Sequence, residues 1–150
     1  MKAVVQRCAE ASVSVDGELK AKAGRGYMVL LGVERGDTIA DADYMIDKLL
    51  KLRIFEDDVG KMNLSLPQIG GEMLIISQFT LITDIPVGNR PYFGDAEDPS
   101  AAESMYDYVC EKIGAQVPVG KGVFGAHMNV SLINDGPVTI VINSRDKLKH

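Results

Sequence analysis

The strongest constraint on the fold comes from two apolar runs of strand length, GYMVLLGVE at 26–34 and GEMLIISQFTL at 71–81. Neither run shows the polar alternation of a half-exposed strand, so each predicts a strand near the centre of a sheet, and the first is expected to be covered on both faces. A chain of 150 residues can bury such strands in one domain, predicted to span 1–150, without metal or disulfide staples.

Further strands and two helices surround these runs. Period-two alternation over 11–16 leads into an Asp16-Gly17 hairpin signal, and 127–133 alternates in the same way. Apolar residues at helical spacing follow Thr38, a candidate N-cap, and a second such set occurs over 100–113. The helices do not alternate regularly with the strands, which favours an α+β fold with a mostly antiparallel or mixed sheet, curled or barrel-like. The apolar helix positions expected to face the core are Ile39, Ala42, Ile46, Leu49, Leu50, Ala102, Met105, Val109 and Ile113.

Charge and cysteine content narrow the class of protein. The formal net charge is −5 and the pI is about 5.0, so an RNA partner would need a local basic patch or recognition through shape and the 2′-OH. Cys8 and Cys110 match no zinc or redox spacing and predict buried, reduced thiols. No signal-peptide pattern and no apolar run near ~18 residues occurs. We therefore expect a cytoplasmic protein with no membrane partner, no metal and no cofactor.

A polar group follows directly on the second apolar run. Ser77, Gln78 and Thr80 could belong to an edge strand that leaves the core, or they could line a pocket where backbone N–H groups and short polar side chains hold an oxyanion. Thr80 can act as a nucleophile only with a base nearby. The two histidines, His127 on the polar face of a predicted strand and His150 at the C-terminus, make a Ser-His-Asp relay unexpected.

The tetrapeptide NDGP at 134–137 interrupts the strands predicted at 127–133 and 138–143. The simplest prediction is a hairpin turn, in which Gly136 takes a positive φ and Pro137 opens an edge strand. The alternative is a cis Gly136-Pro137 bond, which brings neighbouring carbonyls to the same side. Such a rigid pair of acceptors could hold an ammonium group.

A long loop is predicted at 82–98, because this segment contains two prolines and two glycines. Loops of that length in compact domains are more often functional than idle. Arg90 is of the type that binds phosphate or carboxylate. Tyr92 and Phe93 could stack on bases, or they could simply anchor the loop.

Taken together, these motifs resemble the D-aminoacyl-tRNA deacylase (D-tyrosyl-tRNA deacylase) family. SQFTL at 77–81 and NDGPVT at 134–139 are similar to the two signature motifs of the family, in the same order and at the same separation. The resemblance extends over essentially the whole chain. The other matching segments are AVVQRCAEASVSVDGE near the start, LRIFEDDVGKMNLS at 52–65, GNRPYF at 88–93 and GVFGAHM at 122–128.

The resemblance implies an enzyme that hydrolyses the ester of D-aminoacyl-tRNA, acting as a homodimer with its sites at the subunit interface. It implies that Gly136-Pro137 is cis and reaches into the partner's pocket, where its main-chain atoms exclude L-amino acids. Because glycine has no side chain to exclude, glycyl-tRNA is also expected to be a substrate. The implied pocket floor is Ser77, Gln78, Phe79 and Thr80, with Phe124 and Met128 near the terminal adenosine.

The resemblance also implies a catalytic route that needs no side-chain base. The 2′-OH of the last ribose would assist attack on its own ester, while the protein supplies orientation and backbone donors. One segment departs from the family pattern, because Asp84 and Val87 stand where relatives often carry basic residues. Arg90 and Lys121 are then the nearest candidates to meet the tRNA acceptor stem.

Two other functions fit the same residues. A non-catalytic RNA-binding module would bind tRNA and leave the ester intact. A small-ester hydrolase would depend on the Thr80 hydroxyl as its nucleophile.

Overall fold

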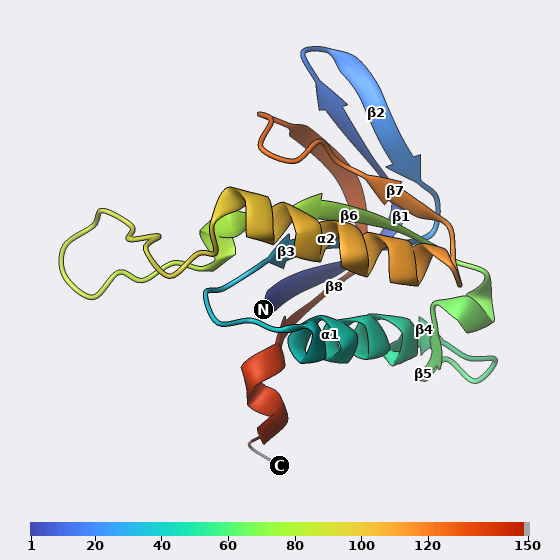
Figure 1. Ribbon diagram of the computed structural model, residues 1–150. Coiled ribbons are helices and arrows are strands. Elements are labelled where there is room, and N and C mark those ends of the chain that lie inside the picture. Colours follow the sequence, from blue (N-terminus) through green and yellow to red (C-terminus); the bar gives the residue numbers. More distant parts are fainter. Residues whose placement is uncertain (149–150) are drawn as a thin grey trace.

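The computed structural model describes residues 1–148 and has eight strands and two α-helices (Figure 1). The strands are β1 (Lys2–Val15), β2 (Glu18–Ala23), β3 (Gly26–Gly32), β4 (Arg53–Glu56), β5 (Met62–Ser65), β6 (Glu72–Ser77), β7 (Val119–Lys121) and β8 (Asn129–Asn143). The helices are α1 (Ile39–Lys51) and α2 (Pro99–Gly114), with short 3₁₀ turns η1 (Pro67–Ile69), η2 (Phe79–Leu81) and η3 (Ser144–Leu148).

Six strands form one mixed sheet in the order β2-β1-β3-β6-β7, and β8 pairs with β1. The pairs that β1 makes are antiparallel, whereas β3, β6 and β7 run parallel. The two ends of this order approach each other, since a Cβ added at Gly120 of β7 would lie 3.2 Å from the Cβ of Ala21 in β2. The predicted α+β class with a barrel-like mixed sheet is confirmed.

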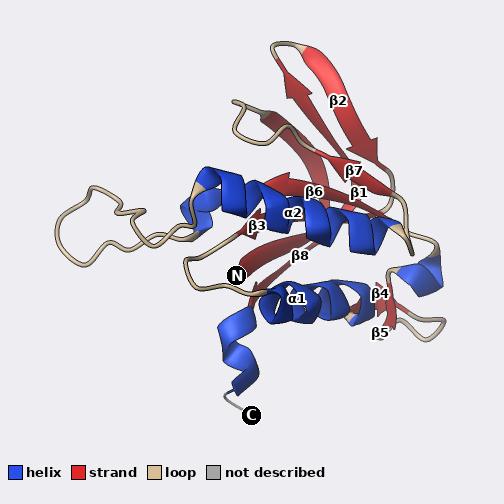
Figure 2. Ribbon diagram, viewed as in Figure 1, coloured by secondary structure: helices blue, strands red, loops and turns tan. Residues whose placement is uncertain are grey.

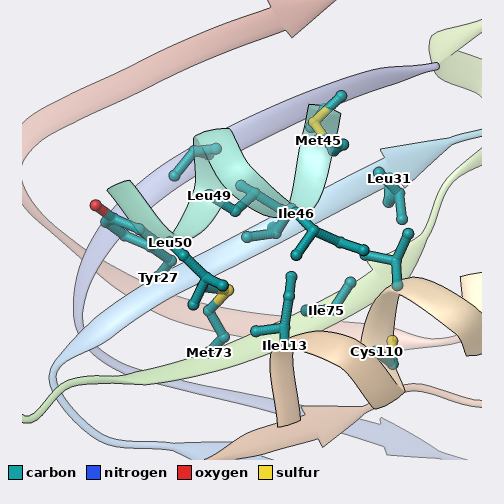
Figure 3. Packing of buried hydrophobic residues seen from close by; sticks show 14 of the residues in the cluster. Tyr27, Leu31, Met45, Ile46, Leu49, Leu50, Met73, Ile75, Cys110 and Ile113 are labelled. Atoms are coloured by element: carbon teal, nitrogen blue, oxygen red, sulfur yellow. The ribbon is translucent and has the colours of Figure 1, made fainter. Parts of the chain in front are cut away.

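Helices α1 and α2 lie over the same side of this sheet, as the colouring by secondary structure shows (Figure 2). Thr38 is the N-cap of α1, and Asp41 reaches back to it: Asp41 Oδ2 accepts a hydrogen bond from the Thr38 backbone N–H at 2.9 Å. Buried apolar side chains from α1, α2, β3 and β6 pack together in the core between helices and sheet (Figure 3). Its fully buried side chains include Tyr27, Val29, Leu31, Met45, Leu49, Met73, Ile75, Val109 and Ile113. Cys8 and Cys110 are buried free thiols, as predicted.

One helix prediction is wrong at its first position. Ile39 is 49% exposed, because it is the first residue of α1 and lies ahead of the turns that contact the core. Met45, which was not predicted, is fully buried on that face. In α2, Ala102 and Met105 are only partly buried and pack at the edge of the core.

The hairpin predicted at 134–137 is also wrong. β8 runs through this segment, because both of its halves pair with the long strand β1 and not with each other: Cys8 pairs with Asn134, and Gln6 pairs with Thr139. The four residues between Asn134 and Thr139 therefore stand opposite one residue of β1 and form a bulge. We call residues 135–138 the β8 bulge.

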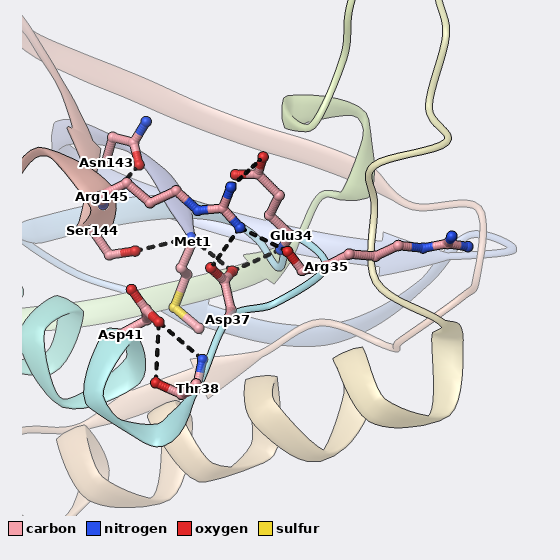
Figure 4. A network of polar contacts seen from close by, with 9 residues as sticks. All are labelled: Met1, Glu34, Arg35, Asp37, Thr38, Asp41, Asn143, Ser144 and Arg145. Atoms are coloured by element: carbon pink, nitrogen blue, oxygen red, sulfur yellow. Dashed lines mark hydrogen bonds and ion pairs between the residues drawn. The ribbon is translucent and has the colours of Figure 1, made fainter.

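A buried ionic network ties the chain start to two other segments (Figure 4). The Met1 ammonium lies 2.6 Å from Asp37, both side chains have no exposure, and the ammonium donates to Ser144 Oγ at 3.0 Å. Arg145 joins the network through Glu34, at 3.0 Å. The network fastens β1, the β3–α1 connection and η3 to one another. Among the described residues, neither helix is both long and apolar enough to cross a bilayer.

Candidate functional site

A cavity of about 500 Å³ opens where β3 and β6 end, beside the start of α2 and the segment 122–128. Five of the residues predicted for the site line it together: Ser77, Gln78, Phe79, Phe124 and Met128. They come from segments almost fifty residues apart in the sequence, which the parallel pairing of β3, β6 and β7 brings to one edge. The remaining lining includes Leu31, Val33, Ala96, Glu97, Ala102, Tyr106 and His127.

The turn that follows β6 shapes one wall of this cavity. Strand β6 ends at Ser77, earlier than the predicted run 71–81, because the chain turns into η2 at Phe79. The last bond to β3 is the one that the Gln78 N–H donates to the Leu31 carbonyl at 2.8 Å. Gly32 permits this close approach, since a Cβ there would lie 2.9 Å from the Gln78 carbonyl oxygen. Within η2 the Leu81 N–H donates to the Gln78 carbonyl at 3.3 Å. The backbone N–H groups of residues 79 and 80 come before that first hydrogen-bonded turn, so they have no partner within η2 and can donate to a ligand.

Thr80 does not line the cavity with Ser77, Gln78 and Phe79 of its motif. Its side chain is exposed, and its Oγ1 accepts a hydrogen bond from Gln78 Nε2 at 2.5 Å. An amide nitrogen is a donor and cannot take a proton from the hydroxyl. The arrangement therefore gives Thr80 no base that would make it a nucleophile.

Aromatic side chains build two further walls. Phe124 lies 6.2 Å from the ring of Tyr106, whose hydroxyl donates to the Ile75 carbonyl at 2.6 Å. Burial raises the pKa of Tyr106, so its hydroxyl stays a neutral donor. At the rim, the rings of Phe79 and Phe93 meet edge to face at 5.4 Å. Sequence reasoning missed Tyr106, whose only signal was its helical spacing from Val109 and Ile113.

The cavity contains few ionisable groups. Among its lining residues, Glu97 supplies the carboxylate and His127, which is exposed, supplies the imidazole. His150, the other histidine, lies outside the described residues. Within residues 1–148 no cluster of His, Cys, Asp or Glu side chains has the geometry of a metal site. The site thus offers backbone donors, amide and hydroxyl groups and aromatic surface.

The β8 bulge lies away from this cavity. Gly136 and Pro137 are exposed, the peptide bond between them is cis, and neither residue lines the cavity of its own chain. Buried Arg7 holds the bulge in place: its Nε donates to the Asp135 carbonyl at 2.8 Å and its Nη1 donates to the Ile54 carbonyl at 2.7 Å. Sequence reasoning missed Arg7, because a charged residue on a strand gives no sign of being buried.

The two cations proposed for tRNA contact differ in their surroundings. Lys121 is paired with Asp107 at 2.7 Å, and this hydrogen bond raises the pKa of the Lys121 ammonium. Arg90 is exposed near the tip of the loop 82–98. Two backbone hydrogen bonds of 2.9 Å between Asp84 and Tyr92 join the limbs of this loop, which projects from the body of the protein in Figure 1.

Comparison with known proteins gives one consistent result. The family model described as D-Tyr-tRNA(Tyr) deacylase matches residues 4–143. The D-aminoacyl-tRNA deacylase of Kosmotoga olearia is 53% identical over 145 residues, which is 97% of this chain and 98% of that protein. The protein of the same name from Anaeromyxobacter dehalogenans is 52% identical over 146 residues, with the same two coverages.

Solved structures agree on the fold. The c-Myc DNA Unwinding Element Binding Protein superposes with a TM-score of 0.90 at 42% identity, covering 95% of this chain and 98% of that one. A probable eukaryotic D-amino acid tRNA deacylase superposes with a TM-score of 0.80, covering 94% and 97%. The second structure is 19% identical and shows similarity of fold alone.

Proposed function

The chain belongs to the D-aminoacyl-tRNA deacylase family, and from that premise we propose that it hydrolyses the ester bond of D-aminoacyl-tRNA. The products are the free D-amino acid and tRNA. We extend the proposal to glycyl-tRNA, because a site that works by excluding the L-side chain has nothing to exclude in glycine. A tRNA substrate and two reduced thiols are also consistent with the cytoplasm as the place of action.

The observation that carries the proposal is the gathering of five motif residues around one cavity in a chain of this family. Its volume of about 500 Å³ suits one ligand of nucleoside size. Phe124 and Met128 offer an aromatic and a thioether surface for the adenine ring of the last nucleotide. The ester would then lie towards Ser77 and the N–H groups of η2.

For the chemical step we propose hydrolysis without a side-chain nucleophile. Water attacks the ester carbonyl, and the negative charge that develops on its oxygen is stabilised by backbone N–H groups of the 77–80 segment. The neighbouring 2′-OH of the ribose assists attack at the ester it adjoins. The donor bond from Gln78 to Thr80 and the lack of a base beside Thr80 support this route over one through the Thr80 hydroxyl.

For chiral selection we propose that the β8 bulge of a second copy completes the cavity. Within one chain, Gly136 and Pro137 are exposed and do not line the cavity, so they can act on a substrate only across a subunit interface. Their main-chain carbonyls would accept hydrogen bonds from the α-ammonium of a D-aminoacyl group. An L-side chain in the same pose would collide with this rigid backbone.

The test is hydrolysis of D-tyrosyl-, L-tyrosyl- and glycyl-tRNA by the same preparation. We expect turnover of the D-tyrosyl and glycyl esters and none of the L-tyrosyl ester. Equal rates on D- and L-tyrosyl-tRNA would refute the chiral mechanism, and binding of tRNA with every ester left intact would identify a non-catalytic module. A tRNA with a 2′-deoxy terminal ribose tests the 2′-OH step, and its rapid hydrolysis would exclude that step.

A further inference from the structure

The cavity rim is poorly suited to hold RNA phosphates. The loop 82–98 beside it contains one cation, Arg90, and four carboxylates: Asp84, Asp95, Glu97 and Asp98. Lys121, the other candidate, forms an ion pair with Asp107 at 2.7 Å, and Arg35 beside the loop forms one with Asp98 at 3.5 Å. Phosphate contacts normally supply much of the affinity for nucleic acid. A protein of net charge −5 must therefore gather its positive charge elsewhere if it is to bind a tRNA.

Positive charge gathers at the other end of the molecule from the loop. Arg25, Lys48, Lys51 and Arg53 are all exposed there, and we call these four residues the basic patch. Lys51 forms an exposed ion pair with Asp47 on α1, so the patch keeps an excess of positive charge through its other three cations. They come from the β2–β3 turn, the last turn of α1 and the start of β4, segments that lie together opposite the projecting loop in Figure 1. The Arg25 guanidinium lies 5.4 Å from the ring centre of Phe55 in β4, which holds it towards the other three.

A hollow of about 510 Å³ adjoins this patch. Lys51 and Arg53 line it together with the amides of Asn63 and Gln68 and the hydroxyl of Ser65. Arg53 is oriented by hydrogen bonds to Asn63, including one from Nε to the carbonyl at 2.8 Å. Arginine, lysine, hydroxyl and amide groups are the side chains that contact phosphate and ribose in nucleic-acid complexes. We infer that the basic patch and this hollow bind the phosphate backbone of the tRNA acceptor stem.

The location of the patch fits a tRNA that spans two subunits. In the sheet, Gly26 pairs with Cys8, and Cys8 pairs with Asn134 at the edge of the β8 bulge. Arg7 joins the bulge to the Ile54 carbonyl, next to Arg53 in β4. The inference rests on the proposed function: where the bulge of one subunit completes the cavity of the other, the basic patch stands beside that cavity. The 3′ end then enters one subunit while the stem lies on its partner.

The test compares a long and a short substrate. The double variant Lys51→Gln/Arg53→Gln is assayed on D-tyrosyl-tRNA and on D-tyrosyl-adenosine between 50 and 200 mM NaCl. Each lost phosphate contact lowers the slope of log KM against log salt by about 1, so we expect a decrease of about 2 for D-tyrosyl-tRNA. At 50 mM salt, KM should rise at least tenfold with kcat unchanged. Because D-tyrosyl-adenosine has no stem, its hydrolysis should keep the wild-type KM.

The matched control is Lys20→Gln/Lys22→Gln on β2, which removes the same charge outside the patch. It should retain the wild-type slope and KM on D-tyrosyl-tRNA. A wild-type slope in the patch variant, or an equal decrease in both double variants, would overturn the inference. If loss of the Arg53 contacts unfolds β4–β5, the variant Lys48→Gln/Lys51→Gln carries the same expectation from α1. Failure of wild-type protein to cleave either substrate would instead refute the proposed function.

Discussion

Replacement of Arg7 by lysine should loosen the β8 bulge without removing the buried charge. The Arg7 guanidinium uses two separate nitrogens to reach the Asp135 and Ile54 carbonyls at 2.8 and 2.7 Å. A lysine ammonium is a point charge and lacks the fork that spans both acceptors. One hydrogen bond from a charged donor is then lost, which costs about 1.5–3 kcal/mol.

That loss should appear both in stability and in chiral selection. We expect the free energy of unfolding in urea to fall by about 1.5–3 kcal/mol. If the free energy that separates the D- from the L-tyrosyl transition state falls by the same amount, the ratio of kcat/KM for D- over L-tyrosyl-tRNA should fall by roughly 10- to 100-fold. Arg35→Lys is the control, because Arg35 is 61% exposed and a surface change there should cost less than about 0.5 kcal/mol. An Arg7→Lys protein with wild-type stability and D/L ratio would refute the positioning role of Arg7.

Three further outcomes follow from the structure. Thr80→Ala should keep kcat on D-tyrosyl-tRNA within about threefold of wild type, a change of less than about 1 kcal/mol; complete loss of turnover in a folded variant would restore Thr80 as the nucleophile. Asp37→Asn removes the only anionic partner that lies within 4 Å of the buried Met1 ammonium among the described residues, leaving the Ser144 hydroxyl, and should lower the unfolding free energy by about 3–5 kcal/mol. The control is Asp47→Asn, which removes an exposed ion pair with Lys51 and should change the unfolding free energy by less than about 0.5 kcal/mol. Similar losses of stability in the two variants would contradict the burial argument. Burial raises the pKa of Cys110 from 9.0 to about 11, so the unfolded chain loses that proton first and stability should fall as pH rises from 9 to 11. Cys110→Ala should flatten this part of a urea-unfolding profile, and an unchanged profile would assign the loss to other groups.

Local patterns in the sequence identified most elements of the fold. The apolar run at 26–34 and the alternation after Cys8 predicted β3 and β1 because burial on one or both faces has a simple periodic signature. Thr38 predicted the start of α1 because an N-cap bonds to a residue only three positions further on, here Asp41. The residues of SQFTL and NDGPVT pointed to the site through their resemblance to a family.

The errors fall where a distant strand or the end of an element decided the outcome. Asp135-Gly136 has a strong hairpin signal, but a hairpin forms only if its two arms pair with each other. Here the fourteen residues of β1 are long enough to pair with both arms, and the turn signal became a bulge. Ile39 has the correct helical spacing, yet its position at the first residue of α1 leaves it exposed.

The sequence by itself determined the class of fold, the two motifs and the shortage of general bases, because each of these depends on residue type and short spacing. Only the tertiary structure decided that Arg7 is buried against the β8 bulge, that Lys121 is paired, and that positive charge gathers around Lys51 and Arg53. Hydrogen bonds and ion pairs act over a few ångströms between segments far apart in the chain. Which of these groups meet is settled by strand pairing and helix packing across the whole domain.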